Sequence, residues 1–212
     1  MVGAERARLP ERVFRQEYGG EFLEGSGAVF RYVRECATGE FGWPVRGLSY
    51  YGGLDLARVQ DFTVLAILDE HRRVAYVDRF HRLDWSMQIA RLTPTTEEYG
   101  CSVFVDSTGA GEPIYESLLL AGVSAQPYPF TQASKAALIN NLAMMLERRQ
   151  LQLPRPEDWP EGIDELEAFE YSVTDQGTVR TGAPYGCHDD CVVALALAAW
   201  HFKPSACGVG FG

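Results

Sequence analysis

The pattern of apolar and polar positions becomes regular from Leu48 onward. Three short β-type runs joined by brief polar links predict antiparallel strands over 49–56, 62–68 and 74–80. Asp84 is placed to cap a helix that begins at Trp85. Beyond that helix, strands are expected over 102–105 and 123–127, and helices over 113–120, 134–149 and 189–202. Residues 163–170 fit a helix or a strand, and 171–181 fit a β-hairpin.

This order of elements predicts the fold class. Three antiparallel strands followed by alternating helices and strands are typical of an α/β fold, with a central mixed sheet and helices on both faces. Residues 1–47 differ from the rest because they are rich in glycine turns and show little periodicity. We interpret 1–47 as a linker or the tail of a preceding domain, 48–203 as the folded domain and 204–212 as a flexible C-terminal tail.

Composition narrows the class of protein. The chain has 212 residues, of which 46% are hydrophobic, as expected for one globular domain with a substantial core. Neither a membrane-spanning apolar segment nor a secretory signal is recognisable. Five cysteines, an odd number, favour reduced thiols. The net charge of −10 argues against a nucleic-acid partner, although the acidic surplus is concentrated in residues 154–212.

Acidic residues stand at the ends of predicted elements, where the fold itself does not require them. Asp55 lies in the first strand, Asp106 ends the strand after the first helix, and Asp189 and Asp190 open the last helix. A carboxylate in such a place is costly to bury unless it is paired or binds a metal. Carboxylates from neighbouring strand ends can converge on hard divalent ions such as Mg²⁺ or Mn²⁺.

Each of these residues also has a purely structural explanation. Asp55 could be a turn residue, and Asp106 could start a turn or cap the next helix. Asp189 is an adequate N-cap, and Asp190 then lies in the first turn, where the helix dipole favours a negative charge. The combination of all four, rather than any one of them, favours a metal site.

Three segments together resemble the nuclease domain of the large terminase subunit of tailed bacteriophages: GLDLARVQDFTVLAILD, VFVDSTGAGEPIYESL and HDDCVVALALAAW. The resemblance covers about residues 48–202 and implies a ribonuclease H-like fold. It also implies an endonuclease that cuts concatemeric viral DNA during genome packaging with two divalent ions, Mg²⁺ or Mn²⁺. The catalytic residues would be Asp55, Asp106 and Asp190. The metal ligands would be Asp55, Asp106, Asp189, Asp190 and Asp61.

Other residues are secondary candidates near the expected site. Arg58, Lys135 and His188 are candidates for DNA contact, although solvated or satisfied side chains would explain the last two. The turn Asp175-Gln176-Gly177 precedes the acidic pair, and in the family resembled such a hairpin can lie beside the active site and regulate access to DNA. The Cys187-His188-x2-Cys191 spacing lacks the fourth ligand of a structural zinc site.

The resemblance also implies partners and a location. Large terminase subunits carry an ATPase motor before the nuclease, and the phosphate loop of such a motor is absent from this sequence. Expected partners are double-stranded DNA, an ATPase motor domain of the same polypeptide, the small terminase subunit and the portal protein, without a membrane, in the host cytoplasm during virus assembly. The alternatives are a resolvase or transposase core of the same fold, an actin- or sugar-kinase-type phosphate-binding domain, and a non-catalytic DNA-binding module.

Overall fold

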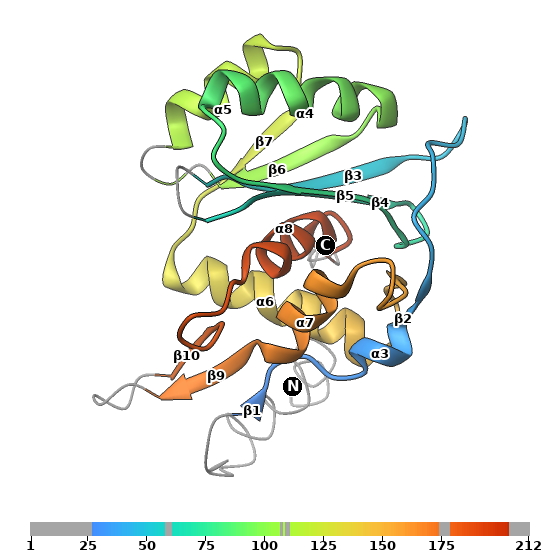
Figure 1. The fold of residues 1–212 in the computed structure, drawn as a ribbon, viewed down its shortest axis with the longest axis vertical. Coiled ribbons are helices and arrows are strands. Elements are labelled where there is room, and N and C mark those ends of the chain that lie inside the picture. The colour runs from blue at the N-terminus through green and yellow to red at the C-terminus, as the bar shows by residue number, and fades with distance from the viewer. Residues whose placement is uncertain (1–26, 58–60, 107, 109–110, 174–178, 204–212) are drawn as a thin grey trace, which may run out of the picture.

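A five-stranded sheet lies at the centre of the computed structural model, which describes residues 27–57, 61–106, 108, 111–173 and 179–203 (Figure 1). The strands are β3 (Tyr50–Asp55), β4 (Thr63–Asp69), β5 (Val74–Phe80), β6 (Ser102–Asp106) and β7 (Ala125–Tyr128). Their spatial order is β5-β4-β3-β6-β7. The first three are antiparallel neighbours, whereas β6 and β7 run parallel to β3. The predicted mixed sheet is therefore confirmed.

Helices cover both faces of this sheet (Figure 1). One face carries α4 (Trp85–Tyr99) and α5 (Gly111–Leu120), and the other carries α6 (Gln132–Glu147), α7 (Pro160–Ala168) and α8 (Asp190–Trp200). As predicted, Asp84 caps α4, because its side chain accepts a hydrogen bond from the backbone N–H of Met87 at 2.9 Å. The segment 163–170, which fitted either a helix or a strand, belongs mostly to α7.

Each face of the sheet has its own hydrophobic core. The core between the sheet and the helices α4 and α5 contains the fully buried side chains of Leu54 and Leu65 from the sheet and Leu118 from α5. On the other face α8 is apolar all round, which suits a helix buried between the sheet and α6. Gly53 of β3 faces α8 so closely that a Cβ there would collide with the backbone of Ala194 and Ala198. This close contact fixes the position of α8 against the strand that ends in Asp55.

Part of the segment expected to be a linker belongs to the folded core. Residues 27–39 form β1 (Gly27–Ala28), α3 (Val33–Cys36) and β2 (Ala37–Gly39). Val29, Phe30 and Val33 are buried in the same core as α8. β1 pairs with β9 (Glu170–Val173), which also pairs with β10 (Val179–Gly182), and β2 pairs with β8 (Leu153–Pro154). The packing therefore does not break at residue 47, because buried side chains from both sides of that position share one core.

The described strands β9 and β10 agree with the hairpin expected over 171–181, and the turn between them lies outside the described residues. Among the residues that the structure describes, no helix is both long and apolar enough to cross a membrane. The tail 204–212 lies outside the described residues.

Candidate metal centre

Two aspartates end neighbouring parallel strands. Asp55 is the last residue of β3 and Asp106 the last residue of β6. The register pairs Leu54 with Val105, so the two aspartates follow side by side at one edge of the sheet. Asp61 lies at the same edge, because it stands two residues before Thr63, the first residue of antiparallel β4, whose Val64 pairs with Asp55.

The N-terminus of α8 brings the acidic pair to this edge. The Oδ2 atom of Asp190 accepts a hydrogen bond from the backbone N–H of Phe62, which follows Asp61, at 3.4 Å. Asp190 is buried, with 7% of its surface exposed, and Asp189 is half-buried. The five aspartates expected to be metal ligands therefore come from β3, β6, the start of β4 and the start of α8, and they share one edge of the sheet.

The electrostatics of Asp55 show how closely these carboxylates interact. Desolvation raises the pKa of Asp55 well above its usual value, and the charges of Asp190, Asp189 and Asp106 raise it further. The Lys135 ammonium acts in the opposite direction and lowers that pKa. Without a cation, this edge holds more negative charge than its surroundings can stabilise, which is the condition that a bound divalent ion relieves.

Asp190 is in a similar environment. Burial raises the pKa of Asp190, while the Phe62 N–H and His188 lower it and the charges of Asp61 and Asp189 raise it. The Nδ1 atom of His188 lies 3.4 Å from Asp190 Oδ2, and the Nζ atom of Lys135 lies 3.7 Å from Asp189 Oδ2. The two candidate DNA-contacting side chains that the structure describes therefore both touch the acidic pair.

The residues present suit a hard divalent cation by their chemistry. The donors are carboxylate oxygens, which Mg²⁺ and Mn²⁺ prefer. Within the described ranges, however, no three acidic, histidine or cysteine side chains are gathered closely enough to form a ready-made ligand set. The carboxylates would therefore have to draw together around an ion, which would offset the like charges that act on Asp55.

The purely structural explanation is supported for Asp106 and not for Asp189. Asp106 does make a turn bond, because its Oδ1 atom accepts the backbone N–H of Thr108 at 2.8 Å. Asp189 is the N-cap residue of α8, yet its side chain accepts no capping bond from the described N–H groups of that helix. The capping function alone therefore does not account for Asp189.

Some predicted residues are not placed. Arg58 and the turn Asp175-Gln176-Gly177 lie outside the described residues. Cys187 and Cys191 are free thiols, the first exposed and the second buried. Together with His188 they form no metal-binding group in the part of the chain described here.

Sequence reasoning missed the residues behind this edge. Arg79 of β5 pairs with Glu165 of α7, with 3.2 Å between Nη2 and Oε1, and Glu165 also accepts a hydrogen bond from α8. Arg79 and Glu165 are 86 positions apart. No local pattern links them. The signal that the sequence offers for Glu165 is an acidic residue at a buried position of a helix. That signal cannot be used while 163–170 fits a helix and a strand equally well.

A second set of residues that the sequence did not indicate, Thr63 and Gln88, fixes the backbone that follows Asp55. The Thr63 hydroxyl accepts the backbone N–H of Ala57 at 3.0 Å. The side chain of Gln88, buried in α4, donates to the Ala57 carbonyl at 3.0 Å and accepts from the Thr63 hydroxyl at 2.8 Å. Both backbone groups of Ala57 are thus held from β4 and α4, two residues after the predicted ligand.

Comparison with known proteins gives a consistent result. The model of the family described as the terminase RNaseH-like domain matches residues 52–202. The large terminase subunits of Thermus phage G20c and Thermus virus P23-45 are 34% and 33% identical to this chain over 207 residues, which is 91% of this chain and 42% of either relative. The chain therefore spans less than half the length of these curated relatives.

Solved structures agree with the family match. The large terminase nuclease from thermophilic phage G20c with bound magnesium has a TM-score of 0.74 at 30% identity, covering 82% of this chain and 96% of that chain. The large terminase nuclease domain of Thermus phage P74-26 has a TM-score of 0.72 at 29% identity, covering 81% and 94%. The nuclease domain of the large terminase subunit of bacterial virus Sf6 shares the fold, with a TM-score of 0.63 at 14% identity over 82% of this chain and 98% of that chain.

Proposed function

The chain belongs to the family of terminase RNaseH-like domains, as a nuclease domain of the large-terminase type, and we propose that it cuts concatemeric viral DNA during genome packaging. The observation that carries the proposal is that Asp55, Asp106, Asp189 and Asp190 share one edge of the sheet, where burial and then the charges of the other three raise the pKa of Asp55. The family match favours this function over a resolvase or transposase core, a phosphate-binding domain and a non-catalytic module.

We assign the aspartates as follows. Asp55, Asp106 and Asp190 are the catalytic carboxylates that would hold two divalent ions, with Asp189 and Asp61 as further ligands. The G20c nuclease structures, described with bound magnesium, cobalt and zinc, support divalent ions of this kind. When bound, such ions would activate a water molecule for attack on the phosphodiester and stabilise the leaving oxygen.

The other residues of the site would act on the DNA backbone. Lys135 and His188, which lie at the acidic pair, would contact phosphate oxygens and orient the strand. We assign the same function to Arg58, in the segment between Asp55 and Asp61. Because phosphate contacts carry no base information, cleavage is expected to show little sequence preference. The turn Asp175-Gln176-Gly177 would regulate access of DNA to the site.

The full-length protein would supply what this domain lacks. We propose that an ATPase motor of the same polypeptide precedes the nuclease, that the small terminase subunit and the portal protein are its partners, and that it acts in the host cytoplasm during virus assembly. Residues 48–203 would carry the nuclease site, and the described elements of 27–39 pack into the same core. Because the chain carries a net charge of −10, it should bind DNA weakly and in a salt-sensitive way without the motor.

The experiment that tests this function is plasmid cleavage by the purified chain. Supercoiled DNA should be nicked and linearised with Mn²⁺, and EDTA should abolish the reaction. Asp106→Asn should also abolish it, whereas Asp164→Asn, which changes an exposed acid on α7, should cut like the wild type. Cleavage that continues in EDTA, or in Asp106→Asn, would overturn the proposed site.

A further inference from the structure

The first turn of α8 is capped in an unusual way. A helix normally satisfies its first backbone N–H groups with the side chain of its own N-cap residue, and Asp is one of the best residues for this. Asp189 occupies that position but accepts no capping bond from the described residues of α8, and its Oδ2 atom lies instead 3.7 Å from Lys135 Nζ. The cap of the helix must come from another residue.

Glu165 provides this cap from a different helix. Its Oε2 atom accepts the backbone N–H of Cys191, the second residue of α8, at 2.7 Å. The bond is buried, and only 8% of the Glu165 side chain is exposed. A short charge-assisted bond of this kind is among the strongest hydrogen bonds in proteins. The N-terminus of α8 is therefore anchored by α7, and the side chain of Asp189 is released from capping.

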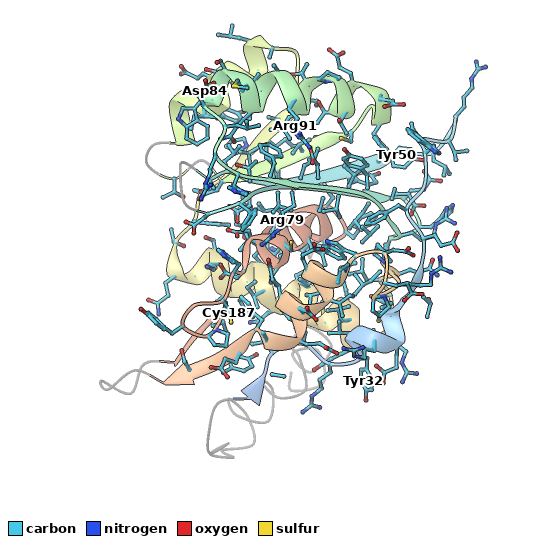
Figure 2. The ribbon with its side chains drawn as sticks, in the orientation of Figure 1. Tyr32, Tyr50, Arg79, Asp84, Arg91 and Cys187 are labelled. Atoms are coloured by element: carbon cyan, nitrogen blue, oxygen red, sulfur yellow. The ribbon has the colours of Figure 1, made fainter. Side chains whose placement is uncertain are left out.

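Arg79 connects this anchor to the other side of the acidic pair. Its guanidinium donates to Glu165 Oε1 at 3.2 Å and stacks on the Phe62 ring, 3.4 Å from the ring centre. Figure 2 shows Arg79 between the sheet and the helices α7 and α8. The backbone N–H of Phe62 in turn donates to Asp190 Oδ2. One chain of contacts thus runs from Glu165 through Arg79 and Phe62 to Asp190.

Burial of the charged side chains of Glu165 and Arg79 costs free energy, which argues that the pair has a functional role. Burial raises the pKa of Glu165, and the Cys191 N–H and Arg79 lower it again. The Nε atom of Arg79 is buried and has no hydrogen-bond partner within the described part of the chain. Well-packed apolar side chains would often be at least as stable as a buried ion pair. Stability of the fold alone therefore does not explain the pair.

We propose that Glu165 is a positioning residue that caps α8 from outside the helix, so that the carboxylates of Asp189 and Asp190 remain available to divalent ions. This inference rests on the proposed nuclease function. It predicts that the acceptor atom at the Cys191 N–H, rather than the charge of Glu165, determines the geometry of the acidic pair.

Two substitutions separate the acceptor from the charge. Glu165→Gln and Glu165→Met remove the same charge and have nearly the same size, but only Gln keeps an oxygen that can accept the Cys191 N–H. Glu167→Gln is the control, because Glu167 lies on the same helix and pairs on the surface with Arg34, with 2.7 Å between Oε1 and Nε. The measurement is the affinity for Mn²⁺ alone, by calorimetry, with folding checked by circular dichroism.

The expected result is that Glu165→Met binds Mn²⁺ about tenfold or more weakly than Glu165→Gln, as is usual when a residue behind a metal ligand is lost. Glu167→Gln should bind like the wild type. Equal affinities for the Gln and Met variants, with tight binding by the wild type, would overturn the positioning role and leave the proposed function intact. A wild-type chain that binds no Mn²⁺ would overturn both.

A second measurement does not depend on any variant folding. In a crystal of the wild-type chain soaked in Mn²⁺, Glu165 should still accept the Cys191 N–H while Asp189 or Asp190 contacts the ion. A structure in which Glu165 itself binds the ion, or in which Asp189 turns back to cap α8, would contradict the proposal.

Discussion

The antiparallel pair β3–β4 carries a carboxylate at each end, and the two have opposite surroundings. At one end Asp69, paired with Tyr50, is 3% exposed. Its Oδ1 atom accepts the backbone N–H groups of His71 and Arg73 at 2.9 and 3.0 Å, and its Oδ2 atom accepts Arg73 Nε at 2.7 Å. These contacts tie the Asp69 carboxylate into the tight turn between β4 and β5.

At the other end Asp55 faces like charges. Burial raises the pKa of Asp55 well above its usual value, the charges of Asp190, Asp189 and Asp106 at the same edge raise it further, and the Lys135 ammonium opposes them. The difference teaches that burial of an acid does not by itself indicate chemistry. Asp69 is the more buried of the two, yet its partners only complete a tight turn. The neighbours of Asp55 are mostly carboxylates, and a bound cation would offset their negative charge.

The largest effect expected from this contrast is at the Asp55 end. Asp55→Asn should lower the rate of Mn²⁺-dependent plasmid cleavage by about 1,000-fold, because several kcal/mol of transition-state stabilisation depend on the ions that the carboxylate holds. The melting temperature in metal-free buffer at pH 7 should stay the same or rise, because the substitution removes repulsion among the carboxylates. Cleavage assays and thermal unfolding measure the two effects on the same samples.

The melting temperature also tests the sign of the linkage. A carboxyl group whose pKa is raised in the folded state contributes stability at low pH that is lost as the pH rises through that pKa. The advantage of Asp55→Asn over the wild type should therefore shrink as the pH falls toward 4. A variant that melts well below the wild type at pH 7 would mean that Asp55, like Asp69, is a structural carboxylate.

The sheet could be predicted from the sequence because its signal is local. The apolar run and alternation of 62–80 placed β4 within one residue and β5 without error. The elements of residues 27–39 were missed because strands of two or three residues and one helical turn are too short to show a period. Their burial depends on contacts with distant segments such as Phe169, whose carbonyl accepts the Val29 N–H at 2.9 Å.

The acidic edge could be predicted for a different reason. Asp55, Asp106 and the pair Asp189–Asp190 stand at element ends, and parallel strands bring such ends together. The residues behind the edge could not be predicted in this way. Glu165 and Arg79 meet only after α7 packs against α8 and the sheet, and Gln88 reaches Ala57 across 31 positions. Such roles follow from tertiary packing, which no local spacing encodes.

The middle of β3 offers the next test, because it links the two ends. Gly53→Ala should destabilise the fold by about 3 kcal/mol, since the added methyl group would force α8 away from the strand. Cleavage should fall as well, because Asp190 moves with α8, and both effects are measured by chemical denaturation and the plasmid assay. Gly42→Ala is the control, because a Cβ there meets no atom within 4 Å. A Gly53→Ala variant with wild-type stability would contradict the observed packing.

A smaller effect is expected at the Asp69 end. Asp69→Asn should lower the free energy of unfolding by about 2 kcal/mol, because the buried turn loses its ion pair with Arg73 and gains donors that face other donors. The folded fraction should cleave DNA at the wild-type rate. Urea denaturation and the plasmid assay together measure both quantities. Loss of cleavage in folded Asp69→Asn would break the contrast between the two ends.

The smallest effect concerns His201, which lies beside β3 between these ends. Its ring packs at a tilt against Tyr51 and Phe104, and its Nε2 atom is 3.1 Å from the Gly52 carbonyl oxygen. Burial lowers the pKa of His201, and the Gly52 carbonyl acts against this by raising it. The neutral ring is therefore favoured in the folded state. Its contribution to stability is present above the unfolded pKa of about 6.5 and is lost as the pH falls through the folded pKa.

The prediction is tested by thermal unfolding in EDTA. Between pH 7.5 and 5.5, the melting temperature of the wild type should fall further than that of His201→Gln. Equal losses would show that the stability of the fold does not depend on the protonation of His201.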